Sequence, residues 1–278
     1  MYLRPRTLSE ASEALARGGR VLAGGTDFFP ALGDRPSTGI VIDVTALTEI
    51  QGISIAADHI RIGGATTWSE IVATPLPRRF DALRAAAREV GGVQIQNRGT
   101  IAGNLCNASP AADGVPPLLV LDAEVELVSA AGRRRVRVSD FIVGNRKTVR
   151  RPDEILATVV IPCRGNEGVS AFLKLGARRY LVISIAMVAA LLVPDEHGRI
   201  AEARVAVGAC SVTAQRLTEL ETVLAGAPFG PGLGSLVKPE HLSRLSPIDD
   251  VRAPAAYRTD AALLLVRRVL ELCAGSHA

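Results

Sequence analysis

"NRGTIAGNLCNASPAADG", residues 97–114, is a stretch made largely of glycine, alanine, asparagine and other small residues. A second stretch of this kind, "AGGTD" at residues 23–27, directly follows a short apolar run. Small side chains let the backbone come close to a ligand. Glycine also takes positive φ readily, so that successive N–H groups can point into one concavity. Both stretches are therefore candidate anion-binding segments, although each taken alone is also a serviceable turn.

A diphosphate suits two such segments if they converge, because its two negative charges are spread over several acceptor oxygens. Four side chains would add to the backbone amides: Thr26, Thr100, Asn104 and Ser109. Asp113 stands just past this region and is suited to accept hydrogen bonds from ribose hydroxyls or an adenine amine. The alternative is that Asp113 caps the helix that begins in "GVPPLLVLD".

Composition indicates a globular protein with a sizeable core. The chain has 278 residues, of which 48% are hydrophobic and 22% charged, enough for one large or two modest domains. Apolar runs such as "MVAALLV" at 187–193 are far shorter than the roughly 20 residues of a membrane span. The start of the sequence lacks the pattern of a signal peptide. We expect a soluble, cytoplasmic protein without a membrane span.

Metal and nucleic-acid sites are not indicated. The four cysteines and four histidines are scattered, so that none has the close spacing of a zinc or iron–sulfur site. The net charge is +4, but three Tyr, six Phe and one Trp offer no aromatic platform for bases. We predict no metal ligands and no nucleic-acid partner.

The element pattern predicts an α+β protein. Helices with capping signals are expected over 7–19 and 66–74, a third over 79–92, and a helix start in 115–121. Strands are expected near residue 21, at 39–44, 52–56 and 59–64, in two runs joined around Gly132, and at 153–163. "CRGNEGVS" at 163–170 is the best linker, with a boundary near 165. Beyond it we expect three antiparallel strands (171–176, 183–193, 200–210), helices over 213–226 and 256–273, and a loop over 226–239.

No motif for acid–base or nucleophilic catalysis is present. The sequence lacks GxxxxGK[ST], a GxGxxG after a strand, GxSxG and HExxH, and has no obvious carboxylate pair. We therefore name no catalytic residue. A binding site without such groups fits a cofactor that performs the chemistry while the protein positions it.

Two quoted segments carry a family resemblance: "LAGGTDFFPAL" (22–32) and "NRGTIAGNLCNASPAADGVPPLLVLDAEVEL" (97–127). They closely resemble the flavin subunit of molybdenum hydroxylases, a family that includes the medium subunit of aerobic carbon monoxide dehydrogenase and the middle region of xanthine dehydrogenase. The likeness continues through "DEILATVVIP", "AFLKLGARR" and "AYRTDAALLLVRRVLE", and so spans nearly the whole chain.

The resemblance implies a fold and a domain division. Residues 1–165 would form a two-lobed FAD-binding domain of the vanillyl-alcohol-oxidase (PCMH) type, with lobes of about 1–58 and 59–165. Residues 166–278 would form a smaller α+β C-terminal domain like that of carbon monoxide dehydrogenase flavoproteins, with a three-stranded antiparallel sheet and helices.

The resemblance also implies FAD-binding positions. Those expected at the pyrophosphate are Leu22, Ala23, Gly24, Gly25, Thr26, Asp27, Phe28 and Phe29, with Thr100, Ile101, Ala102, Gly103 and Asn104. Asp113 would hold the nucleotide half, while Leu156 and Lys174 would line the flavin, where the Lys174 ammonium would stabilise an anionic reduced flavin. Two positions depart from the family: Ala102 stands where relatives usually have glycine, and Val90 where animal xanthine dehydrogenases have an aromatic residue.

The function implied is electron transfer. FAD on this chain would take electrons from the [2Fe-2S] clusters of a small partner subunit, while a large molybdopterin subunit hydroxylates the substrate. The pair of electrons would pass to an external acceptor, in a heterotrimer expected to dimerise. Two alternatives are a self-sufficient flavin oxidase or reductase of the same fold, and a non-enzymatic FAD- or nucleotide-binding module.

Overall fold

The computed structural model describes residues 1–163 and 168–275, and these residues form two compact units. The first unit holds residues 1–74, 93–108 and 122–163. The second unit holds residues 75–92 and 109–121 together with the described chain from residue 168 onward. The predicted boundary near residue 165 lies outside the described residues.

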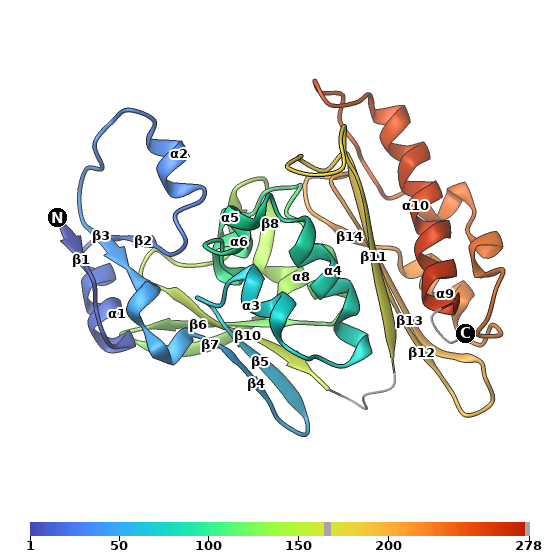
Figure 1. The fold of residues 1–278 in the computed structure, drawn as a ribbon, viewed down its shortest axis with the longest axis horizontal. Helices are drawn as coiled ribbons and strands as arrows, with labels where there is room; N and C mark the ends of the chain where they lie inside the picture. The colour runs from blue at the N-terminus through green and yellow to red at the C-terminus, as the bar shows by residue number, and fades with distance from the viewer. Residues whose placement is uncertain (164–167, 276–278) are drawn as a thin grey trace. The chain divides into compact units, whose positions relative to one another are not determined.

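A small parallel sheet opens the first unit (Figure 1). In spatial order its strands are β1 (Tyr2–Leu3), β3 (Val41–Asp43) and β2 (Arg20–Leu22). Helix α1 (Leu8–Ala16) begins as predicted, because the Thr7 hydroxyl accepts the N–H of Glu10. Its buried face packs into one core with Ile42 of β3.

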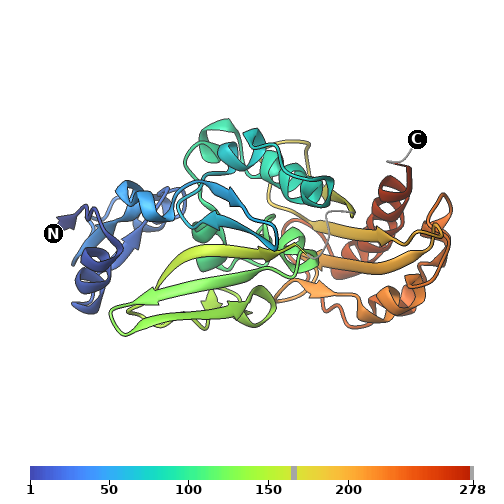
Figure 2. The same cartoon turned by 90° about the horizontal axis from the view of Figure 1, so that it is seen from below.

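An antiparallel five-stranded sheet forms the larger part of the first unit, shown in blue and green in Figure 2. In spatial order its strands are β4 (Ile53–Ile55), β5 (His59–Gly63), β10 (Ile155–Pro162), β6 (Glu124–Ser129) and β7 (Gly132–Arg137). Strands β6 and β7 form the hairpin that the sequence predicts around Gly132.

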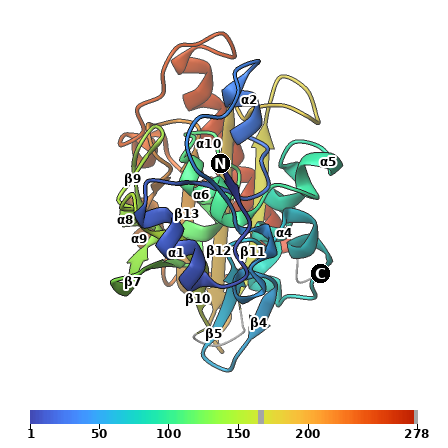
Figure 3. The ribbon, with the colours of Figure 1, turned by 90° about the vertical axis from the view of Figure 1, so that its left-hand side faces the viewer.

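Short helices and one small hairpin complete the first unit. The helices are α2 (Phe28–Leu32), α3 (Trp68–Ala73), α5 (Val93–Gln96), α6 (Ile101–Asn107) and α8 (Val138–Phe141), with 3-10 turns at Val44–Ala46 and Thr48–Ile50. The hairpin pairs β8 (Ile142–Gly144) with β9 (Lys147–Thr148). Figure 3 shows α2 within the blue segment that leaves β2 and returns to β3.

The second unit is built on another antiparallel sheet. In spatial order its strands are β11 (Val169–Leu175), β12 (Ala186–Pro194), β13 (Ile200–Gly208) and β14 (Gln215–Arg216). The helices are α4 (Asp81–Glu89), α7 (Val115–Val120), α9 (Thr218–Leu224) and α10 (Ala255–Gly275), with 3-10 turns at Arg78–Phe80, Leu233–Leu236 and Pro239–Leu242. Side chains of α9 and α10 form one buried core with β12 and β13.

Two sequence predictions need correction. The sheet of the second unit has four strands rather than three, because Gln215 and Arg216 pair with β13. Because these two residues are in a strand, the helix expected over 213–226 begins only at Thr218. The mixed α+β character is confirmed. Within the described residues no helix is long and apolar enough to cross a membrane.

Candidate functional site

The first small-residue segment connects β2 to α2 in the first unit. Gly25 has φ +78°, as expected for a segment that exploits glycine. In the described part of the chain no acceptor receives the N–H groups of Gly24, Gly25, Thr26, Asp27 or Phe28. We call these successive groups the amide run. Because these successive N–H groups have no acceptor in the described chain and are not fully buried, the amide run is a set of donors open to an anion.

The two predicted segments meet in the first unit. A Cβ atom on Gly24 would lie 1.8 Å from the carbonyl oxygen of Arg98 and 3.0 Å from the nitrogen of Gly99. Both residues directly precede Thr100 along the chain. Only a glycine permits this approach, so the lack of side chains at Gly24 has a direct structural cause.

The second segment is the start of a helix rather than a loop, which corrects the sequence interpretation. Thr100 caps α6 by accepting the N–H of Gly103 on its hydroxyl. The N–H of Ile101 donates to Thr66 O at 3.1 Å, and that of Ala102 donates to Gly64 O, also at 3.1 Å. These amides already have acceptors within the protein and are not free for a diphosphate.

Asn104 retains a free polar atom in this segment. Among the described residues its buried Oδ1 has no hydrogen-bond partner, although its backbone N–H bonds to Thr100 O. A buried amide oxygen of this kind calls for a donor. Within the described residues, Asn104 Oδ1 is therefore an acceptor that the second segment can offer to a ligand.

Ala102 is 9% exposed, and its methyl group lies beside Gly64. A Cβ atom on Gly64 would lie 3.1 Å from the Ala102 Cβ and 2.3 Å from Leu156 O. The side chain of Leu156, in β10, is buried in the first unit. Gly64 therefore brings α6 and β10 together, a role that sequence reasoning missed. The signal was the glycine pair in "RIGGATT", in which Gly63 ends β5 and Gly64 follows it.

Asp113 and Lys174 form a buried ion pair within the second unit. Lys174 Nζ lies 2.7 Å from Asp113 Oδ2 and donates to Glu89 O at 3.1 Å. The Ser184 hydroxyl donates to Asp113 Oδ1 at 2.6 Å. Burial raises the pKa of the Asp113 carboxyl, while Lys174 and Ser184 oppose that rise. The helix-cap alternative is wrong, since Gly114 occupies the cap of α7.

The structure also places Ser109, Phe28, Phe29 and Val90. The Ser109 hydroxyl accepts the N–H of Ala111 at 3.2 Å in the second unit. Phe29 is 59% exposed, and Phe28 lies against it edge to face. Val90 follows α4 in extended geometry. In the described residues no group of three or more metal-ligating side chains comes together.

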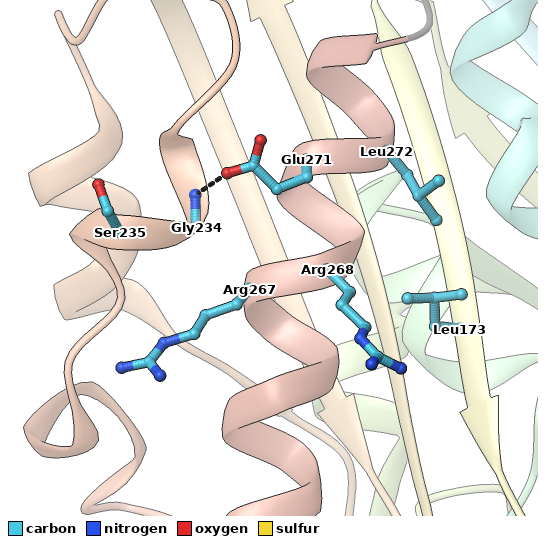
Figure 4. A pocket seen from close by; sticks show the side chains of 7 residues that line it. All are labelled: Leu173, Gly234, Ser235, Arg267, Arg268, Glu271 and Leu272. Atoms are coloured by element: carbon cyan, nitrogen blue, oxygen red, sulfur yellow. Dashed lines mark hydrogen bonds between the residues drawn. The ribbon is translucent and has the colours of Figure 1, made fainter.

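A separate pocket of about 690 Å³ lies along α10 in the second unit (Figure 4). None of the predicted FAD residues lines it. Its lining residues are Leu173, Gly234, Ser235, Arg267, Arg268, Glu271 and Leu272. The Glu271 carboxylate accepts the N–H of Gly234 at 2.7 Å, and so fixes the 3-10 turn beside the helix.

Comparison with known proteins gives the family. Residues 1–164 match the FAD binding domain in molybdopterin dehydrogenase, and residues 171–272 match the CO dehydrogenase flavoprotein C-terminal domain. The chain is 31% identical to the nicotine 6-hydroxylase medium subunit of Paenarthrobacter nicotinovorans, covering 97% of this chain and 95% of the relative. It is 32% identical to a putative xanthine dehydrogenase FAD-binding subunit of Escherichia coli strain K12, covering 97% and 94%.

A solved structure supports the same assignment. The fold is similar to that of reconstituted CO dehydrogenase from Oligotropha carboxidovorans, with a TM-score of 0.87 and 26% identity over 99% of this chain and 97% of that chain. One family match alone covers more than half of this sequence, and both relatives align nearly end to end. The chain therefore belongs to the FAD-binding medium subunits of the molybdenum hydroxylases.

Proposed function

We propose that this chain relays electrons within a molybdenum hydroxylase complex. It would work beside a small subunit with [2Fe-2S] clusters and a large molybdopterin subunit, in a heterotrimer that dimerises. Bound FAD would supply the conversion between one-electron transfer from clusters and two-electron transfer to an external acceptor. The observation that carries the proposal is the amide run beside the close contact of Gly24 with Arg98.

The residues of the first unit fit an FAD diphosphate. The amide run offers successive donors to the diphosphate oxygens. The Asn104 Oδ1, which lacks a partner in the described chain, is an acceptor and would take a hydrogen bond from an N–H or O–H group elsewhere on the cofactor. Leu22 and Ala23 precede the run and Phe29 follows it, while Thr100, Ile101, Ala102 and Gly103, at the cap and first turn of α6, belong to the same proposed set. Their task is to bind and orient the cofactor, since no residue here is needed as an acid or base.

Lys174 and Asp113 stay proposed FAD-binding residues, and their ion pair lies within the second unit. The buried Lys174 ammonium uses two of its three N–H groups on Asp113 and Glu89 O. One N–H remains for a ligand, and a cation held in this way favours negative charge on a neighbouring group. Asp113 fixes the position of that cation. Ser109 and Leu156 complete the proposed set.

Two further points remain proposals. We propose that the division into residues 1–165 and 166–278 marks two domains, supported by the two family matches at 1–164 and 171–272. The PCMH-type description of the first domain and its lobes at about 1–58 and 59–165 rest on the resemblance. A cytoplasmic location stays a prediction from sequence.

Purification from the native host tests the function. We expect a brown complex containing one FAD per chain, a cysteine-rich small chain and a large molybdenum-containing chain, with visible absorption from both flavin and iron–sulfur clusters. Steady turnover of an alcohol or a nicotinamide cofactor by the isolated chain would instead favour a self-sufficient flavoenzyme. A colourless chain that cannot be loaded with FAD would favour the non-enzymatic module.

A further inference from the structure

We propose that Arg146 makes the amide run able to bind a diphosphate by neutralising Asp27. Arg146 belongs to the β8–β9 hairpin of the first unit and was not among the predicted site residues. The inference rests on the proposed function and deepens it. It assigns a positioning residue whose charge sets the affinity for the anionic part of the cofactor.

The carboxylate of Asp27 places a negative charge in the segment that is proposed to bind an anion. The N–H of Asp27 belongs to the amide run, yet its carboxylate carries a negative charge in the same segment. It stands at the cap position of α2 and makes no capping hydrogen bond there. An unneutralised carboxylate beside an anion site repels the ligand that the neighbouring amides attract.

Arg146 brings a cation to this carboxylate. Its Nη1 lies 3.8 Å from Asp27 Oδ1, and this is the only ion pair of Asp27 within the described residues. The side chains of Arg146 and Asp27 are 57% and 58% exposed, so each is also reachable by a ligand. Phe28 in the same segment has Arg20 over its ring at 5.0 Å, a second cation at the amide run.

A hydrogen bond to Ala108 holds the backbone of Arg146 in an unusual conformation. Its φ of +58° lies in the left-handed region, which non-glycine residues rarely adopt. The N–H of Arg146 donates to Ala108 O at 2.9 Å, and its Nη1 also donates to the side chain of Asn107 at the end of α6. Arg146 thus connects the end of α6 to the segment that carries the amide run.

Binding of ADP and FAD to the full chain, freed of flavin, tests the proposal. We expect Arg146→Ala to weaken both ligands about tenfold at low salt, and this loss should shrink in 1 M NaCl because salt screens exposed charges. Arg146→Lys should stay near the wild-type affinity. Arg146→Gln keeps a hydrogen-bond donor but removes the charge, so we expect it to lose affinity about tenfold as well. It supplies this measurement if Arg146→Ala folds poorly.

The decisive variant adds Asp27→Asn to Arg146→Ala. If Arg146 acts by neutralising Asp27, the double variant should recover most of the lost affinity, whereas a purely structural role for Arg146 predicts no recovery. Arg137→Ala is the matched control, since Arg137 is an exposed arginine paired with Asp140 at 2.9 Å in the same unit. It should leave both affinities unchanged.

The outcomes separate two failures. Wild-type protein that binds neither FAD nor ADP would overturn the proposed function together with this inference. Wild-type protein that binds both, with Arg146→Ala unchanged or not rescued by Asp27→Asn, would overturn only the role of Arg146.

Discussion

Gly25 holds the amide run in shape through its left-handed backbone. A Cβ atom there would meet ring carbons of Phe29 at 2.6 and 2.8 Å, but that ring is exposed and free to move. The lasting cost of a side chain is therefore the backbone strain at φ +78°, about 1–2 kcal/mol. Relieving that strain would turn the neighbouring N–H groups away from one another.

Gly25→Ala should lower FAD content more than it lowers stability. We expect folded protein with clearly less than one flavin per chain, measured by visible absorption, and a small fall in melting temperature. Gly18→Ala is the matched control, because Gly18, just past the end of α1, has φ +89° with nothing within 4 Å of a Cβ atom. It should show a similar melting temperature and full flavin content; equal flavin loss in the two variants would contradict the role of Gly25.

Some single residues could be predicted from sequence and others could not. Thr7 and Thr67 cap their helices as the spacing to Glu10 and Glu70 predicts, because a cap is a local interaction. Gly64 and Arg146 were missed, because their importance depends on partners far along the chain. A glycine is informative only once the backbone that approaches it is known.

At the scale of elements, β7 is fastened to the start of β10 by a buried charge. Glu154 is 3% exposed and accepts both Nε and Nη2 of Arg134, at 2.6 and 2.8 Å. It also accepts the N–H of Arg151 at 2.7 Å. The Arg134 hydrogen bond holds the pKa of Glu154 below its usual value of 4.5. The charged form is therefore stabilised by folding.

Glu154→Gln should destabilise the protein by about 2 kcal/mol at neutral pH, the scale of charged hydrogen bonds. Because the folded-state pKa is lowered, the contribution of Glu154 is complete above about pH 4.5 and falls as the pH drops through the folded pKa. Denaturant unfolding of both proteins from pH 7 to pH 3 should show the difference narrowing on the acid side. A difference that stays constant with pH would contradict the assignment.

The elements that sequence patterns missed are the ones stabilised by tertiary contacts. Strand β14 has two residues, Gln215 and Arg216, too few for an alternating pattern, and exists through pairing with β13. Helix α6 contains Gly103 and small neighbours that read as a loop, yet hydrogen bonds to Gly64 and Thr66 hold its first turn. Strands β5, β6 and β10 were predictable because β-branched residues recur along them.

At the scale of the whole molecule, chain order and spatial grouping differ. Residues 75–92 and 109–121 group with the chain beyond residue 168, although they lie in the segment that matches the FAD-binding family. Sequence composition gives no sign of this grouping, because it arises from packing of α4 and α7 on strands β11 to β13. The family resemblance predicted the likeness to CO dehydrogenase, whereas periodicity predicted only separate elements.

FAD should stabilise the entire chain by mass action. A ligand that binds only the folded state adds RT ln(1 + [L]/Kd), about 2.7 kcal/mol at a concentration of 100 Kd. We expect the melting temperature of flavin-free protein to rise steadily with added FAD and much less with riboflavin, which lacks the diphosphate. Equal shifts with both compounds would contradict a diphosphate site in the first unit.

The internal hydrogen bonds of α6 have a consequence for how the holoprotein is made. Since Gly64 and Thr66 accept its leading N–H groups, the first turn of this helix needs no cofactor to satisfy them, and we expect the helix to form before flavin binds. Synthesis and flavin loading are then separable events. Under riboflavin starvation the cell would accumulate empty, correctly shaped chains that regain colour when the vitamin returns.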